Sequence, residues 1–376
     1  MGTMETSAPA GTFQFLPVDR VRFGPGCLRA LGSELDRLGL RRALVITGTS
    51  IATRTDLLWY VEQSLGPRHA ASYTGARQHV PATTVEEALE LAKLADIDCL
   101  VSLGGSSPID TAKAVAHRLA REHADGTPPV HLAVPTTLSA GEFTHFYGIT
   151  DETTRVKTGA GDHHLAPRVV FLDATATLST PRELWLSTGI KALDHAVEGF
   201  LSPDHQPVTD VLALEAVRLL FRYLPITAEN PSDLAARQQC QIAAWMSLFS
   251  PASVRGGLSH ALGHQIGARC DVPHGITACI TLPHVLRFVE RETGPRQRML
   301  LSAMTWEGER PAASAAEAVE RLIERLGLPR RLRDVGVPAN EIAAIAQSAF
   351  PEAQARSGTR PLERVEEVTD LLRAMW

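Results

Sequence analysis

The stretch DCLVSLGGSSPIDTAKAVAHRLAREH (98–123) decides the fold. Its first part is a short apolar run that ends in two glycines, which is typical of a buried strand followed by a tight turn. Its second part carries apolar residues at three- and four-residue spacing, which predicts a helix. Ser107 is a suitable N-cap residue for that helix, and Pro108 suits its first position. The stretch therefore predicts a strand, a glycine turn and a helix in direct succession.

The same alternation runs through the first half of the chain, so we expect a parallel sheet with helical crossovers. Further strands are expected at RALVITG (42–48), VHLAVPTT (130–137) and RVVFLDA (168–174), and a further helix at VEEALELAKLAD (85–96).

The second half of the chain has a different pattern, because its apolar residues follow helical spacing throughout. The change falls in LSTPREL (178–184), where Ser179 or Thr180 would cap a helix that begins at Pro181. We therefore expect an α/β domain with a parallel sheet over residues 1–180 and an all-α domain over residues 181–376.

Composition excludes several classes of protein. The chain has 376 residues, of which 44% are hydrophobic, and its net charge of −5 comes without any dense basic run. A nucleic-acid partner is therefore not expected, and no apolar run approaches the roughly 20 residues of a membrane helix. Five cysteines without a CxxC pair, and a start that lacks the pattern of a signal peptide, favour a reduced, cytoplasmic setting.

The glycine turn is a candidate phosphate site. Gly104 and Gly105 would let a phosphate approach backbone N–H groups at the positive end of the following helix. Asp110 stands where the acid of a capping box reaches back to the helix start, so its role could be structural. The simpler alternative for the whole turn is a plain strand-to-helix connection.

Two threonines follow the next predicted strand, at the edge where ligands bind in open parallel sheets. Thr136 and Thr137 could contact a second part of the same ligand, although a simple hydroxyl turn is the alternative. The GxGxxG pattern of dinucleotide sites does not follow the first strand, and Gly48 stands where an acid would hold the ribose. Either NAD or NADP is therefore compatible with the sequence.

A group of histidines with one lysine is the most informative chemical feature. Lys191 precedes His195 by four residues, His260 precedes His264 by four, and His274 follows. Residues four apart share one face of a helix, and imidazole is a common ligand of divalent transition metals. Three converging histidines indicate a metal site, whereas an ammonium group one turn before His195 argues against a metal.

In combination, these motifs resemble the iron-containing alcohol dehydrogenase superfamily, which includes maleylacetate reductases and is related to dehydroquinate synthase. The matching stretches are FGPG (23–26), GGSSPIDTAK (104–113), VPTTLSAGEFT (134–144), TGIKALDHAVE (188–198), HALGHQIGARCDVPHG (260–275) and TLPHVL (281–286). The resemblance implies an N-terminal dinucleotide-binding α/β domain, a helical C-terminal domain and an active site between them. It also implies a small carbonyl or alcohol substrate and a homo-oligomer, most simply a dimer.

The resemblance assigns roles to individual residues. It implies that the glycine turn cradles a pyrophosphate and that Lys157 lies near the ribose of NAD or NADP. The candidate cofactor-binding residues are Gly104, Gly105, Ser106, Ser107, Asp110, Thr136, Thr137 and Lys157. In metal-dependent members an Asp and three His hold the ion; the three histidines here are His195, His260 and His274, and His264 matches a proton-relay histidine.

The sequence departs from the family pattern at the metal-binding Asp, whose position is taken by Lys191. Asp194 is adjacent to His195 and so points about 100° away from it on a helix, which makes it a poor replacement. Our leading hypothesis is a metal-free, NAD(P)-dependent oxidoreductase. Lys191 would stabilise the substrate oxygen, and His264 or His260 would supply the proton.

Two alternatives remain open. In one, Lys191 lies at the surface or pairs with Asp194 or Glu198, and the three histidines bind iron or zinc as in a metal-dependent alcohol dehydrogenase. In the other, the fold serves a non-redox lyase or cyclase in which the lysine forms a Schiff base. Arg255 and Arg269 flank the histidine motif and could bind a carboxylate, although surface pairing is expected for each.

Overall fold

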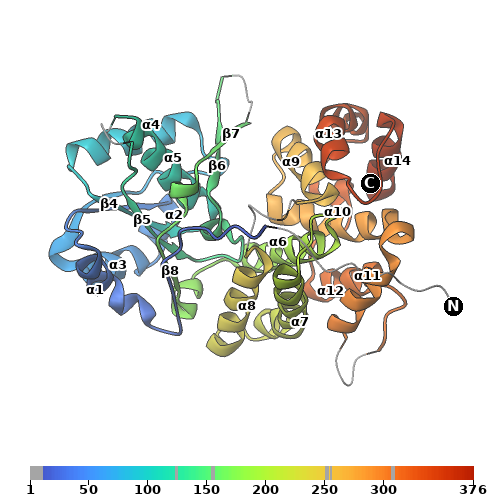
Figure 1. Cartoon of the computed structure of the whole chain (residues 1–376), viewed down its shortest axis with the longest axis horizontal. Coiled ribbons are helices and arrows are strands. Elements are labelled where there is room, and N and C mark those ends of the chain that lie inside the picture. Colours follow the sequence, from blue (N-terminus) through green and yellow to red (C-terminus); the bar gives the residue numbers. More distant parts are fainter. Residues whose placement is uncertain (1–11, 123–125, 154–156, 250–253, 255, 306–309) are drawn as a thin grey trace.

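The N-terminal half of the molecule (Figure 1) is built on a six-stranded parallel sheet. Its strand order is β1-β8-β5-β4-β2-β3. The structure is a computed structural model that describes residues 12–122, 126–153, 157–249, 254, 256–305 and 310–376. The strands are β1 (Arg20–Phe23), β2 (Ala43–Thr47), β3 (His69–Tyr73), β4 (Cys99–Gly104), β5 (Val130–Pro135) and β8 (Val169–Leu172). The predicted parallel α/β architecture is thus confirmed.

Helices cover both faces of this sheet, because alternate residues of a strand point to opposite sides. Leu44 and Ile46 of β2 pack in one apolar cluster with helices α4 and α5, whereas Val45 packs in another with α1 and α3. These helices are α1 (Leu31–Leu38), α3 (Leu57–Leu65), α4 (Ala82–Leu94) and α5 (Ser106–Glu122). The short helix α2 (Thr49–Arg54) follows β2.

Several features of this half were not predicted: helices α1, α2 and α3, the two edge strands β1 and β3, and an antiparallel hairpin. The hairpin consists of β6 (Phe146–Thr150) and β7 (Lys157–Gly161). Edge strands have one unpaired side and a mixed burial pattern, so their sequences lack the continuous apolar run that marks β4.

The C-terminal half is entirely helical over its described residues and has one large apolar core. Its helices are α6 (Arg182–Leu201), α7 (Pro207–Glu229), α8 (Leu234–Ser247), α9 (Leu258–Cys270), α10 (His274–Phe288), α11 (Glu290–Ala303), α12 (Ala315–Leu326), α13 (Ile342–Arg356) and α14 (Val365–Met375). None of the helices in the described ranges is long and apolar enough to cross a membrane.

Two helix starts differ from the prediction by one residue or more. Helix α5 begins at Ser106, so Ser107 lies inside the helix, where its carbonyl accepts a hydrogen bond from Thr111. Helix α6 begins at Arg182 with Pro181 as its N-cap residue. Thr180 does not cap it, because its hydroxyl donates to the carbonyl of Thr136 instead.

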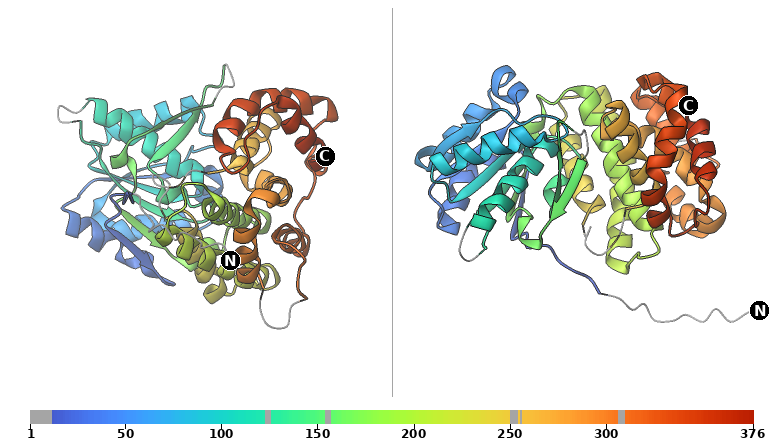
Figure 2. Two further views of the ribbon diagram at one scale, coloured as in Figure 1. Left: turned by 45° about the vertical axis from the view of Figure 1, so that its right-hand side comes forward. Right: turned by 90° about the horizontal axis from the view of Figure 1, so that it is seen from above.

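The two halves lie side by side (Figure 2). Hydrogen bonds and packing join them. The backbone N–H of Leu138 donates to the hydroxyl of Thr188 at 3.2 Å, and Leu138 also packs against Gly189 of the same helix. A second contact joins the imidazole of His79 to the carboxylate of Asp271 at 3.1 Å. The segment between β5 and β6 therefore reaches from the sheet to helix α6.

Candidate active site

The glycine turn at the end of β4 forms a cradle that only glycine permits. Gly104 has φ +141°, and a Cβ atom there would lie 2.9 Å from the Pro108 ring. A Cβ atom on Gly105 would lie 3.1 Å from Thr137. The backbone is therefore bare at the N-terminus of α5, where N–H groups and the helix dipole favour a phosphate.

The predicted cofactor residues on β4 and β5 are brought together. Gly104 and Pro135 pair at the ends of the two strands, and the N–H of Thr136 donates to the carbonyl of Gly104. Thr137 lies against Gly105, and its hydroxyl is 3.0 Å from that of Ser139.

The remaining cofactor candidates have different positions. Ser106 is the first residue of α5 and contacts Gly141, whereas Ser107 and Asp110 lie within the helix. Lys157 is the first residue of β7, and its side chain lies outside the described part of the structure.

The four histidines converge from three helices. His195 of α6 stacks on His260 of α9, with ring centroids 4.8 Å apart and planes inclined by 19°. His274, the first residue of α10, has its ring centroid 5.6 Å from that of His260 and 5.1 Å from that of His264. The i, i+4 spacing on α9 thus places His260 and His264 on one face, as predicted.

Glu198 holds His260 and the start of α9 together. Its carboxylate accepts hydrogen bonds from the N–H groups of Gly257 and Ser259 at 2.8 and 2.6 Å, and it lies 2.5 Å from Nδ1 of His260. A carboxylate at a helix N-terminus is stabilised by the exposed N–H groups. This arrangement fixes the His260 ring and leaves its Nε2 atom buried without a hydrogen-bond partner.

Asp194, expected to point about 100° away from His195, lies against His260 of α9. It is buried, accepts a hydrogen bond from the hydroxyl of Ser259 and lies 3.3 Å from Nδ1 of His260. Burial and the neighbouring charge of Glu198 raise the pKa of Asp194. Burial alone would lower the pKa of His260. The carboxyl groups of Asp194 and Glu198 together have a larger, opposite effect, so the pKa of His260 is raised.

His264 belongs to a second network. Its Nδ1 atom lies 2.9 Å from Oε1 of Glu352 on α13, and the same oxygen lies 2.9 Å from Nε of Arg356. The side chain of His264 is 42% exposed, so it is accessible to solvent. Desolvation by the surrounding helices nevertheless lowers the pKa of His264 in spite of the favourable pairing with Glu352.

Lys191 is partly exposed and lies on the same helix as His195, one turn before it. Burial lowers the pKa of His195 well below its usual range, and the charges of His260 and Lys191 lower it further. Burial and the charge of Lys191 do the same to the pKa of His274. The ammonium group therefore acts on both rings.

Two buried charged residues of the α/β half were not singled out from the sequence. Lys113 of α5 is fully buried, and its ammonium group donates to Gly141 O, Thr144 Oγ1 and Phe146 O. Glu142 is also buried, with its Oε2 atom lacking a hydrogen-bond partner. Burial raises the pKa of Glu142 to about 7, although the charges of Lys113 and Lys191 act in the opposite direction.

Models of known families match both halves of the chain. The model described as iron-containing alcohol dehydrogenase matches residues 18–174, and that of the Fe-containing alcohol dehydrogenase family, C-terminal, matches residues 185–376. The chain belongs to the iron-containing alcohol dehydrogenase family. It is therefore an oxidoreductase that acts on carbonyl or alcohol groups.

Relatives within the family cover most of the chain. A maleylacetate reductase of Pseudomonas aeruginosa is 33% identical over 89% of each chain. A lactaldehyde reductase of Escherichia coli K12 is 32% identical over 94% of this chain and 97% of its own. The crystal structure of maleylacetate reductase from Agrobacterium tumefaciens, 28% identical, superposes with a TM-score of 0.86 over 98% of this chain and 99% of its own.

The residues present do not fit the metal site of the iron-containing alcohol dehydrogenase family. Lys191 carries an ammonium group one turn before His195 on α6, and an ammonium group cannot ligate a metal ion. Within the described part of the chain, the donor atoms that all lie within 4.8 Å of one another belong to Asp194, Glu198 and His260, not to the three predicted histidines. The carboxylate of Glu198 is already occupied by three hydrogen-bond donors. This set is a hydrogen-bonded acid–imidazole arrangement rather than a metal cage.

The acids that orient the histidines could not be found from sequence spacing. Glu352 lies 88 residues after His264. Glu198 lies 62 residues before His260, and its only sequence signal is a position one turn after His195 on the same helix. Of the two arginines considered, Arg269 pairs with Glu341 at 2.6 Å, as expected of a surface residue, and Arg255 lies outside the described residues.

Proposed function

We propose that the protein is a metal-free, NAD(P)-dependent reductase of a small carbonyl compound or oxo acid. The observation that carries this proposal is the place of Lys191. It is half-buried on α6, and its charge lowers the pKa of His195 and of His274. The resemblance of TGIKALDHAVE (188–198) to the family motif assigns it to the position of the metal-binding Asp. The names of the relatives, maleylacetate reductase and lactaldehyde reductase, indicate the range of substrates.

The glycine turn is the feature that favours a nicotinamide dinucleotide as the cofactor. The bare backbone of Gly104 and Gly105 at the start of α5, with Thr136 and Thr137 beside it, suits a pyrophosphate. When bound, the nicotinamide supplies the hydride. The N-terminus of helix α5 and the two threonines would hold the cofactor. The segment 136–142 contacts α6, so the bound cofactor would lie along it with one end near α6.

Lys191 and a histidine would complete the reaction. Hydride transfer to a carbonyl produces negative charge on oxygen, and an ammonium group stabilises that charge by attraction and hydrogen bonding. The oxygen must then be protonated. We assign the proton to His264, which is accessible and oriented by Glu352; His260, whose Nε2 atom is unpartnered, is the second candidate.

The test is a kinetic comparison of Lys191→Met with the unmodified protein, purified without chelators. Consumption of NADH and NADPH is followed with maleylacetate and with lactaldehyde. Removing one group that stabilises an oxyanion typically lowers kcat by about 10²–10³-fold, and we expect that loss. Lys93→Met is the matched control, because Lys93 pairs with Glu122 at the surface.

Metal content is measured on the same samples by elemental analysis. We expect far less than one iron or zinc per chain, with activity that is unchanged by chelators. A stoichiometric metal that disappears in His260→Ala would overturn the metal-free mechanism. Failure to oxidise either reduced cofactor with any carbonyl would overturn the proposed function.

A further inference from the structure

We propose that Arg356 binds a carboxylate of the substrate, so that the enzyme prefers oxo acids to neutral carbonyl compounds. This inference rests on the proposed reductase function and goes beyond it by naming a substrate class and the residue that selects it. Arg356 is the last residue of α13, far in sequence from every motif of the active site.

The position of Arg356 beside the histidines follows from two sets of contacts. Its Nε atom and Nδ1 of His264 both lie 2.9 Å from the same oxygen of Glu352. On its other side, Nη1 lies 3.1 Å from the point that a Cβ atom on Gly256 would occupy, and the His260 ring lies 3.8 Å from that point. The guanidinium group therefore adjoins the Glu352–His264 pair and lies against Gly256, four residues before His260.

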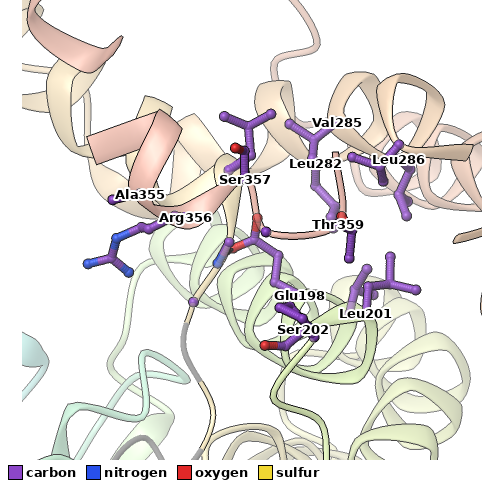
Figure 3. Close-up of a pocket in the computed structure, with 17 residues that line it drawn as sticks. Glu198, Leu201, Ser202, Leu282, Val285, Leu286, Ala355, Arg356, Ser357 and Thr359 are labelled. Carbon is purple, nitrogen blue, oxygen red and sulfur yellow. Dashed lines mark hydrogen bonds between the residues drawn. The ribbon is translucent and has the colours of Figure 1, made fainter. Parts of the chain in front are cut away.

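The guanidinium group is also accessible. The side chain of Arg356 is 34% exposed, and its ion pair with Glu352 uses Nε. Figure 3 shows a pocket whose apolar wall includes Leu201, Leu282 and Leu286, and the guanidinium group extends away from these side chains. A guanidinium group binds a carboxylate through two parallel N–H bonds, and the fork of its terminal nitrogens suits this geometry.

Arg356 and Lys191 together suit a substrate with two negative or partly negative oxygen groups. Lys191 lies one turn before His195 on α6, and Arg356 shares a carboxylate oxygen of Glu352 with His264. An oxo acid would place its reacting carbonyl at the lysine and its carboxylate at the arginine. Arg269 is a weaker candidate for this role, because it is engaged with Glu341.

The experiment compares a charged and a neutral substrate. Maleylacetate carries carboxylates and lactaldehyde carries none, so Arg356→Gln should raise KM for maleylacetate by about 10–100-fold, the usual range for losing a hydrogen bond to a charged group. For lactaldehyde the loss in kcat/KM should be at least about tenfold smaller than for maleylacetate, because only maleylacetate loses a hydrogen bond to a charged group. Arg356→Lys should be intermediate, because lysine keeps the charge but loses the fork.

Arg269→Gln is the matched control, because it removes an arginine–glutamate pair from the surface of the neighbouring helix α9. Equal losses with both substrates in Arg356→Gln would overturn the proposal and show that Arg356 acts only by orienting Glu352 and His264. An unchanged KM for maleylacetate would overturn it as well.

A binding measurement separates this inference from the proposed function. Succinate is used as an unreactive dicarboxylate, and its binding is measured by calorimetry in the presence of cofactor. We expect binding to the unmodified protein that is at least about tenfold weaker in Arg356→Gln, one step on the logarithmic affinity scale. Succinate binding without any reductase activity would refute the proposed function alone, whereas equal or absent binding in both proteins would refute the role of Arg356.

Discussion

Glu142 is a buried carboxyl group, and its burial determines how tightly it binds a proton. It lies on the segment between β5 and β6, which contacts α6, and its Oε2 atom has no hydrogen-bond partner. Lys113 stays close but directs its three N–H donors to neutral oxygen atoms. Transfer of a charged carboxylate into such a site costs more than transfer of the neutral acid, so the folded protein binds this proton more tightly than the unfolded chain does.

Replacing Glu142 should therefore change how stability depends on pH. The pKa of Glu142 rises from 4.5 in the unfolded chain to about 7 in the folded protein, so its contribution to stability declines as pH rises through that interval. Gln cannot titrate. The free energy of unfolding of Glu142→Gln should thus rise relative to the unmodified protein by roughly 3 kcal/mol between pH 4.5 and pH 7.

Urea unfolding at pH 5 and pH 7.5 measures this difference. Glu142→Asp is the control, because it keeps a carboxyl group at the same position and should retain most of the pH dependence. A difference between Glu142→Gln and the unmodified protein that is the same at both pH values would show that the buried acid does not titrate in this range.

At the scale of helices, the active site depends on the close packing of α6 against α10. Gly275 follows His274, and a Cβ atom there would lie 2.8 Å from the carbonyl carbon of Ser187 on α6. Backbone atoms cannot move aside as a flexible side chain can, so any larger residue would separate the helices. His274 and His195, which approach from these two helices, would separate with them.

Gly275→Ala should lower the free energy of unfolding by about 1–3 kcal/mol, the usual cost of overpacking, and should reduce kcat. Thermal unfolding and steady-state kinetics give the two quantities. Gly294→Ala is the control, because a Cβ atom there meets only an arginine nitrogen at 3.7 Å. In a helix that change should stabilise by about 0.5–1 kcal/mol. Similar effects of the two substitutions would contradict the packing argument.

The elements that sequence patterns predicted are those with a strong local signal. The buried strands β2, β4, β5 and β8 carry continuous apolar runs, and the helices of the second half carry regular apolar spacing. Edge strand β3 is only half-buried and β7 has the sequence KTGAG, so neither stands out from a loop. The helix start at Ser106 was displaced because the turn at Gly104, rather than a serine cap, ends the strand.

The same limit applies to the active site. Helical spacing placed Lys191 one turn from His195 and His260 one turn from His264, because those relations are local. It could not identify Glu352 or Arg356, which α13 brings to His264 through tertiary packing. Nor could it place Asp194, because the i, i+1 rule describes its direction on α6 but not the helix that it meets.

At the scale of the whole molecule, the segment between β5 and β6 contacts both the glycine turn and helix α6. Gly141 packs against Ser106 at the start of α5, and Leu138 bonds to Thr188 and packs on Gly189 of α6. A ligand that reduces the motion of the glycine turn should therefore also reduce the motion of α6, because direct contacts link the two.

Hydrogen exchange measured by mass spectrometry tests this link. Addition of NADH or NADPH should slow exchange at residues 104–113 and 136–144 and also at residues 188–191, while α14 should not change. Gly105→Val is the control, because its side chain would meet Thr137 and occupy the space for the phosphate. Adding the cofactor to this variant should not slow exchange in any of these segments. Protection that appears only in the sheet domain would show that the segment does not couple the two halves.

The single oxygen of Glu352 that His264 and Arg356 share has a thermodynamic consequence. Burial is the main cause of the lowered pKa of His264, and the positive charge of Arg356 lowers it further. A carboxylate that neutralises Arg356 would relieve this second effect, so anion binding and proton uptake at His264 would favour each other by equal amounts. Binding of an acidic substrate would thus increase the fraction of His264 that holds the proton needed for reduction, whereas binding of a neutral aldehyde would leave that fraction unchanged.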